Sequence, residues 1–202
     1  MLFRSVMKSF TDMNENELNK YIVDTQLQID NLIKDYKDKT YKMISKVHNV
    51  ENLMSEAYSI SKIYKEAEWV NQSISMNARV NKRTNILPKR AEIWTCELGE
   101  NIGSEENKIR PVIIIQNDTG NKNAPTTIIV PISNRPKKIA VHISILSGDF
   151  DLIKGEKMEI TGTALVEQIR AVSKARLGRH VATLNSNFMK LLNSKIKISL
   201  QM

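Results

Sequence analysis

Apolar side chains recur at steps of three and four residues along the first third of the chain. Because such steps place side chains on one face of an α-helix, this stripe predicts a long helical region with a heptad-like seam. The first proline is Pro88 and the first glycine is Gly99, so nothing interrupts a helix before them. Thr11 and Asp12, with Glu15 three residues after Asp12, form an arrangement that caps helix starts. The stripe consists of Leu18, Ile22, Thr25, Ile29, Leu32, Tyr36, Met43, Val47, Val50, Met54, Ala57, Ile60, Tyr64, Ala67 and Val70.

The helical region can be one very long helix or a hairpin of two helices. The stripe loses its apolar character over Lys37–Thr40, and Val47–Val50 is weakly helical, so the chain can fold back at either place. We favour the hairpin, because an apolar stripe of this length needs a partner. Beyond Val70 the residues become polar and basic, which indicates a helix end followed by a linker that reaches Pro88.

After Pro88 the pattern changes to short β-type runs separated by turns. In Val112–Ile115, four consecutive β-branched residues predict a buried strand, and the residues from Gln116 onward close it with turn chemistry. Helical spacing returns in residues 186–200, with Asn185 or Ser186 as the cap. The predicted strands are Ala91–Leu98, Val112–Gln116, Thr126–Ile132, Val141–Ile145, Glu159–Val166 and Ile169–Val172.

These elements predict an α+β protein in two parts. Residues 1–88 form a helical extension and linker, either a coiled coil or a helical hairpin. Residues 89–202 form a small, strongly curved β-barrel, because several short strands followed by one terminal helix can close a barrel with that helix.

Composition excludes several classes of protein. The hydrophobic fraction is 41%, but no apolar run approaches the ~18–20 residues of a membrane helix. Charges interrupt the start of the chain before it forms the apolar part of a secretory signal, so we expect a cytoplasmic protein. The single cysteine, Cys96, cannot form an internal disulfide or a cysteine zinc cluster, and the three histidines have no metal-site spacing. We therefore expect neither a metal nor a cofactor.

The charge of the chain favours a polyanionic partner. The formal net charge is +8, of which +2 lies in residues 1–88 and +6 in residues 89–202. Arg110 stands at the start of the strongest strand, directly before Pro111, where its charged head can face solvent or a ligand. A planar guanidinium matches two phosphate oxygens and stays charged at every working pH. Arg110 is thus either a phosphate-binding group or a rim charge with no role.

A series of segments in the barrel part carries a family resemblance. In order along the chain they are Arg90–Trp94, Asn101–Glu105, Arg110–Asp118, Pro125–Ile132, Leu165–Arg170 and Ile196–Leu200. This series resembles the MazF/PemK family of bacterial toxin endoribonucleases, collinearly from about residue 89 to the C-terminus. The resemblance does not cover residues 1–88.

The resemblance implies a fold, an activity and partners. The fold is an SH3-like barrel of the CcdB/MazF type, and the activity is that of a toxin of a type II toxin–antitoxin system. Such toxins are homodimers that cut single-stranded RNA without metal, through attack by the RNA's own 2′-hydroxyl, and an antitoxin protein occupies the RNA groove. The family's catalytic arginine falls at Arg110 and its catalytic threonine at Ser133. Serine keeps the hydroxyl but lacks the methyl group that stiffens the threonine rotamer.

The resemblance also implies a set of RNA-binding residues. Simpler roles exist for some of them: the loop at residues 103–105 can be an ordinary polar hairpin loop, and Glu167 with Gln168 can be satisfied within the protein. Glu106–Lys108 replaces the glycines usual after this loop, so we expect a stiffer loop. The RNA-binding set is Gly103, Ser104, Glu105, Asn117, His142, Glu167 and Gln168.

Two other functions are open. The barrel can be a catalytically silent binder of a protein target, as the structurally similar CcdB toxins are, although Arg110 and the hydroxyl at Ser133 argue against it. Alternatively, residues 1–88 carry the main function as an oligomerising or regulatory module, with the barrel as an accessory. The near-neutral balance of residues 1–88 is unlike an acidic antitoxin tail, so oligomerisation is their favoured role.

Overall fold

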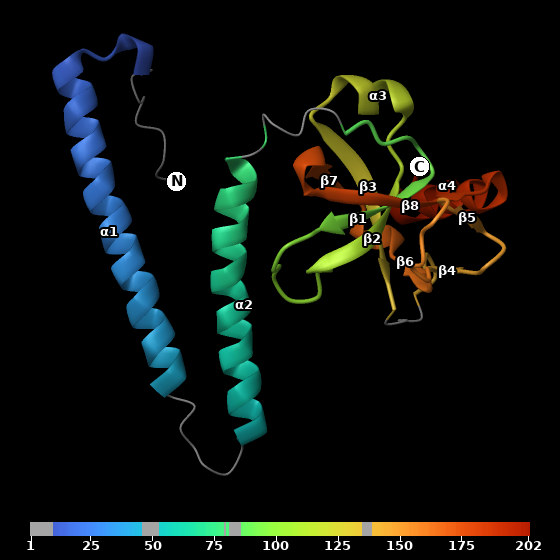
Figure 1. Cartoon of the computed structure of the whole chain (residues 1–202), viewed down its shortest axis with the longest axis horizontal. Helices are drawn as coiled ribbons and strands as arrows, with labels where there is room; N and C mark the ends of the chain where they lie inside the picture. The colour runs from blue at the N-terminus through green and yellow to red at the C-terminus, as the bar shows by residue number, and fades with distance from the viewer. Residues whose placement is uncertain (1–9, 46–52, 79, 81–85, 135–138) are drawn as a thin grey trace. The chain divides into compact units, whose positions relative to one another are not determined.

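The computed structural model describes residues 10–45, 53–78, 80, 86–134 and 139–202 (Figure 1). The chain divides into two compact units, residues 1–64 and 65–202. None of the helices in these described ranges is long and apolar enough to cross a membrane.

Asn14 and Glu17 cap the first long helix, α1 (Glu15–Ser45). The main-chain N–H of Asn14 donates to the Glu17 carboxylate, and that of Glu17 donates to Asn14 Oδ1, each at 3.0 Å. This reciprocal pair satisfies two donors at the helix start. The predicted cap at Thr11 and Asp12 is wrong, because both residues belong to the short 3-10 helix η1 (Phe10–Asp12) that precedes the cap.

The helical region contains α1 and a second helix, α2 (Leu53–Asn77). Helix α1 continues through Lys37–Thr40, so the fold-back predicted there is wrong. Lysines are good helix formers, and ion pairs one turn apart, such as Lys39 with Asp35 at 3.3 Å, suit an exposed helical surface. The other predicted place for a fold-back, Val47–Val50, lies outside the described residues.

The apolar stripe of α1 is exposed. Ile22 is 51% and Leu32 is 68% accessible, and Ile29 and Tyr36 are exposed as well. Apolar surface of this extent favours association, because burying it releases ordered water. Leu18 and Thr25 of the same stripe are partly buried.

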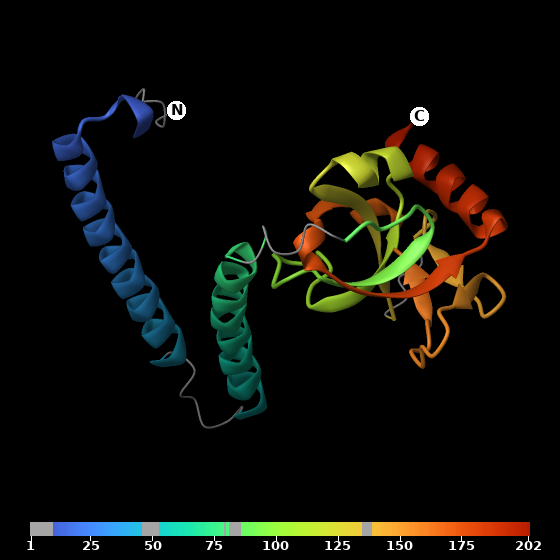
Figure 2. The same ribbon diagram turned by 45° about the horizontal axis from the view of Figure 1, so that its top comes forward.

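The second unit contains a curled antiparallel sheet. The strands run in the order β4-β6-β3-β2-β1-β8-β5, and β7 pairs with β3. Figure 2 shows the strands curving around an interior, with helix α4 (Ser186–Leu200) lying alongside. The strands are β1 (Glu92–Glu97), β2 (Ile109–Ile114), β3 (Thr126–Ser133), β4 (Ile143–Ile145), β5 (Phe150–Leu152), β6 (Gly162–Ala164), β7 (Arg170–Ser173) and β8 (Leu177–Leu184).

Both faces of the central strands are buried. Along β2, Ile113 belongs to one apolar cluster, together with Val130 of β3 and Phe188 and Leu192 of α4. Val112 and Ile114 belong to a second cluster on the other face. Alternate residues of a strand point to opposite faces, so the run of β-branched residues fills both clusters at once.

The predicted barrel fold with its closing helix is confirmed, but the predicted set of strands is incomplete. Strand β8 was not predicted, because Gly178, Arg179 and His180 interrupt its apolar pattern. Strand β5 is too short to give a periodic signal. The segment after β2 forms a short helix, α3 (Asp118–Asn123), where a simple turn was predicted. The predicted Asn185 cap of α4 is present, with its side chain accepting from Phe188 N at 2.9 Å.

Candidate active site

The pairing of β2 with β3 brings Arg110 and Ser133 to the same end and the same face of the sheet. Val112 pairs with Pro131 and Ile113 with Val130. Continued for two more residues, this antiparallel register sets the position of Arg110 opposite that of Ser133. Opposite positions in an antiparallel pair share a face. The two residues to which the sequence assigned catalysis therefore come from neighbouring strands at one sheet edge.

The side chain of Ser133 is buried and has no hydrogen-bond partner among the residues that the structure describes. It is 1% exposed, and among the described residues its Oγ makes no hydrogen bond. A buried hydroxyl left unpaired costs about 1–3 kcal/mol, so native proteins rarely keep one without a reason.

A polar cavity of about 250 Å³ lies beside Arg110. It is formed by the β1–β2 loop (residues 98–108), the start of β2, the 3-10 helix η4 (Val166–Gln168) and His142, which directly precedes β4. The lining residues that the sequence predicted are Gly103, Ser104, Glu105, Arg110, His142, Glu167 and Gln168.

Among the described residues, the guanidinium of Arg110 is held through its Nε. Its Nε donates to the Asn107 carbonyl oxygen at 3.1 Å and lies 3.2 Å from Glu106 Oε2. Within the described part of the chain, neither terminal nitrogen of Arg110 has a hydrogen-bond partner. The group is thus fixed in orientation, with its two terminal nitrogens available to an anion.

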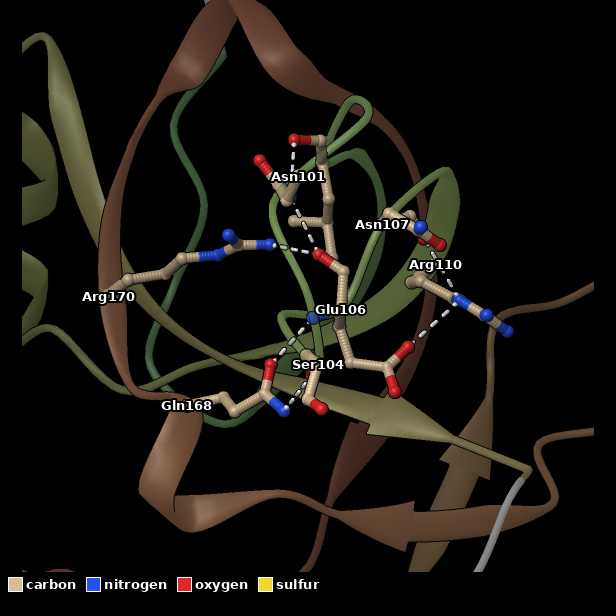
Figure 3. A network of polar contacts seen from close by, with 8 residues as sticks. Asn101, Ser104, Glu106, Asn107, Arg110, Gln168 and Arg170 are labelled. Atoms are coloured by element: carbon tan, nitrogen blue, oxygen red, sulfur yellow. Dashed lines mark hydrogen bonds and ion pairs between the residues drawn. The ribbon is translucent and has the colours of Figure 1, made fainter. Parts of the chain in front are cut away.

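The β1–β2 loop is fastened to the neighbouring elements through its main chain (Figure 3). Gln168 accepts from Glu106 N at 2.7 Å and donates to the Ser104 carbonyl oxygen at 3.1 Å. The Glu106 carbonyl oxygen accepts from Arg170 Nη2 at 2.8 Å and from Asn101 Nδ2 at 2.7 Å. The expected stiff loop is consistent with these four bonds. Gln168 serves here as a clamp on the loop.

His142 and Glu167 form a hydrogen-bonded pair at the cavity. His142 Nε2 lies 2.9 Å and 2.8 Å from the two Glu167 carboxylate oxygens. The histidine side chain is 5% exposed and the glutamate side chain 33%, so Glu167 presents the more accessible surface. These two residues, far apart in sequence, are brought together as a single polar unit.

Two predicted site residues do not line the cavity. Ser133 is buried in β3 and is not among the residues that line the cavity. Asn117 follows the far end of β2, where its side chain caps α3 by accepting from Gly120 N at 2.7 Å. Asn117 lies seven positions after Arg110 and three positions beyond the last residue of β2, Ile114. The geometry therefore gives Asn117 a capping role and does not group it with the other predicted residues.

The sequence assigned no role to Glu106, Asn107, Asn101 and Arg170, which together hold the loop and Arg110 in place. Arg170 is partly buried, and this burial lowers the pKa of its guanidinium. Its Nε is buried without a partner among the described residues. A signal for Glu106 was present in the sequence, because it stands in the segment Glu106–Lys108, where the family that the sequence resembles usually has glycines.

The described residues contain no group of three or more histidine, cysteine, aspartate or glutamate side chains that could hold a metal ion. The polar side chains that line the cavity include instead a cation whose terminal nitrogens have no partner among the described residues and an imidazole–carboxylate pair. Such groups can bind an anion and stabilise negative charge that develops on it.

Comparison with known proteins identifies the second part of the chain. Residues 89–200 match the family model described as PemK-like, MazF-like toxin of type II toxin-antitoxin system. The endoribonuclease MazF of Staphylococcus saprophyticus is 39% identical over 116 residues, which is 56% of this chain and 92% of that protein. The crystal structure of MazF from Deinococcus radiodurans shares the fold, with a TM-score of 0.50 and 14% identity over 58% of this chain and all of that one. The chain therefore belongs to the family of PemK-like, MazF-like toxins of type II toxin–antitoxin systems.

Proposed function

We propose that residues 89–202 form a metal-independent, sequence-selective endoribonuclease that cuts single-stranded RNA. The observation that carries the proposal is the arrangement of Arg110, whose Nε is held by the loop while both terminal nitrogens lack a partner within the described residues. Membership of a toxin family with an endoribonuclease relative supports the same activity.

The proposed reaction uses the RNA as its own nucleophile. The 2′-hydroxyl loses its proton and attacks the adjacent phosphorus, and the bond from phosphorus to the 5′-oxygen breaks. The leaving 5′-oxygen takes up a proton, so the products are a 2′,3′-cyclic phosphate and a 5′-hydroxyl. The protein has to position the strand and stabilise the extra negative charge on the phosphoryl oxygens.

Arg110 stabilises that charge through its terminal nitrogens. Since arginine does not lose its proton in proteins, electrostatic stabilisation suits it better than proton transfer. Ser133, at the opposite position on the neighbouring strand, supplies a second donor. Among the described residues, its buried hydroxyl has no partner that a phosphate would have to displace. A cation and a neutral donor on one face form a small oxyanion-binding site.

The other cavity residues guide the RNA strand. The loop at Gly103–Glu105 and the His142–Glu167 pair offer main-chain and side-chain groups that can bond to the edges of unpaired bases. The charge of +6 on residues 89–202 favours a polyanion electrostatically. Sequence selectivity follows because bases splayed from a single strand expose their hydrogen-bonding edges.

In this proposal the toxin acts in the cytoplasm as a homodimer and is restrained by an antitoxin protein. The family description, which places such toxins in two-component toxin–antitoxin systems, supports the antitoxin. The exposed apolar stripe of α1 supports self-association, because a heptad-like seam is buried when two such helices pair. The helical extension thus strengthens the dimer.

Cleavage is expected to persist in excess EDTA, because the proposed site uses an arginine and a hydroxyl where other nucleases use a metal ion. The measurement is the rate of cutting of a long RNA by purified protein, with and without chelator. A parallel preparation of the Arg110→Ala variant reveals any contaminating ribonuclease. Activity that disappears with chelator and returns with Mg²⁺ would refute the proposed mechanism.

A further inference from the structure

Glu106 occupies a position that is fixed from three directions. Its main-chain N–H donates to Gln168 at 2.7 Å, and its carbonyl oxygen accepts from Arg170 at 2.8 Å and from Asn101 at 2.7 Å. These partners come from η4, from β7 and from the other side of the β1–β2 loop. These hydrogen bonds leave the main chain of Glu106 little conformational freedom, so the Cα atom from which its side chain extends has a defined position.

From this position the side chain of Glu106 holds Arg110. The Glu106 side chain is 15% exposed, and its Oε2 lies 3.2 Å from Arg110 Nε. The Asn107 carbonyl oxygen accepts from the same nitrogen at 3.1 Å. In Figure 3 the terminal nitrogens of Arg110 point away from Glu106. The Nε–H of the guanidinium is thus engaged by the protein.

A guanidinium can bind a phosphate through Nε and one terminal nitrogen, or through both terminal nitrogens. With Nε occupied by Glu106 and Asn107, only the second edge is open. We infer that Glu106 is a positioning residue, which makes Arg110 present its two terminal nitrogens to the scissile phosphate. The inference rests on the proposed role of Arg110 in RNA cleavage.

The negative charge of Glu106 has a second effect on the same site. It offsets part of the Arg110 charge and repels the RNA backbone, so it weakens binding of the substrate in its ground state. Orientation of the guanidinium raises the catalytic rate constant, while the repulsion raises KM. The two effects predict different results for variants that keep or lose the hydrogen-bond acceptor at this position.

Glu106→Gln keeps an oxygen that can accept from Arg110 Nε but removes the charge. We expect kcat within about threefold of the wild-type value and a KM lowered by several-fold, since ~1 kcal/mol changes an equilibrium constant about fivefold. Glu106→Ala removes the side-chain oxygen and leaves only the Asn107 carbonyl oxygen on Arg110 Nε, so the guanidinium samples more orientations. We expect kcat to fall on the order of 10- to 100-fold, because small misplacements of a catalytic group have costs of that size.

The experiment measures kcat and KM on one short single-stranded RNA for the full-length wild-type chain and these variants. The matched control is Glu156→Ala, which removes another glutamate paired with an arginine Nε, that of Arg179 at 2.8 Å, away from the cavity. It should leave both constants unchanged. Thermal unfolding of each variant shows whether it is folded, and Glu106→Gln tests the inference even where Glu106→Ala does not fold.

A double-mutant cycle separates this inference from the proposed function. If Glu106 acts through Arg110, adding Glu106→Ala to Arg110→Ala causes no further loss of cleavage. An equal additional loss in the Arg110→Ala background would overturn the positioning role. So would wild-type kcat in folded Glu106→Ala, or a Glu106→Gln variant whose kcat falls as far as that of Glu106→Ala. An Arg110→Ala variant with full activity would instead refute the proposed function itself.

Discussion

Replacing Arg110 with alanine is expected to lower the rate of RNA cleavage on the order of 10²–10³-fold or more, which is the cost of removing one transition-state donor. The loss should fall mainly on kcat, because the terminal nitrogens of Arg110 act on charge that develops as the phosphorus is attacked. The fixed orientation of the side chain strengthens this expectation, since a preorganised donor needs no rearrangement during the reaction.

The measurement is single-turnover cleavage of a defined RNA by wild-type and Arg110→Ala protein at equal concentration. Arg179→Ala is the matched control, because Arg179 belongs to the same sheet, pairs with Glu156 and is 62% exposed at its side chain. It should cut RNA at the wild-type rate. Circular dichroism confirms that the variants are folded, and full activity in a folded Arg110→Ala protein is incompatible with the proposed site.

Gly162→Ala is expected to disrupt both stability and cleavage, because Gly162 holds β6 against the end of β3. Its φ angle is +129°, and a Cβ there would lie 2.6 Å from the main-chain oxygen of Ser133. The backbone conformation alone costs on the order of 1–3 kcal/mol for a residue with a side chain. The contact with Ser133 adds to this, and relieving it moves the proposed hydroxyl donor, so cleavage should fall by at least about tenfold.

Urea unfolding of the Gly162→Ala variant measures the loss of stability, and the cleavage assay measures the loss of activity. Two glycines of the same domain serve as controls. A Cβ added at Gly148 meets nothing within 4 Å, so Gly148→Ala should be nearly neutral. Gly155 has a φ angle of +87° and also has open space around it, so Gly155→Ala reports the backbone strain alone. A Gly162→Ala variant no less stable than Gly155→Ala would show that the contact with Ser133 is unimportant.

The sequence predicted best those structural features that depend only on neighbouring residues. Four β-branched residues can hardly avoid a buried strand, and Pro111 fixes the residue before it at the rim of that strand. The placement of Arg110 was therefore predictable from neighbouring residues alone. Helix α4 was predictable for the same reason, since its cap at Asn185 and its apolar spacing are both local features.

What the sequence did not predict depends on contacts between distant segments. The role of Glu106 arises because Gln168 and Arg170, more than sixty residues away along the chain, fix its main chain. Strand β8 is held by pairing with β1 on one side and β5 on the other, which compensates for its weak apolar pattern. Asn117 is the reverse case, a residue that the sequence placed in the site. It belongs to a segment that carries the family resemblance, yet the fold uses its side chain as a local cap.

The most direct test of the proposed mechanism is the chemistry of the RNA ends. Purified full-length protein is incubated with a long single-stranded RNA in EDTA, and both new ends are mapped and identified. We expect cuts at a small set of reproducible positions, each with a 5′-hydroxyl on one fragment and a 2′,3′-cyclic phosphate on the other, and none of these cuts with Arg110→Ala protein. Fragments that carry 5′-phosphate ends, or the same cuts from the Arg110→Ala protein, would contradict the mechanism.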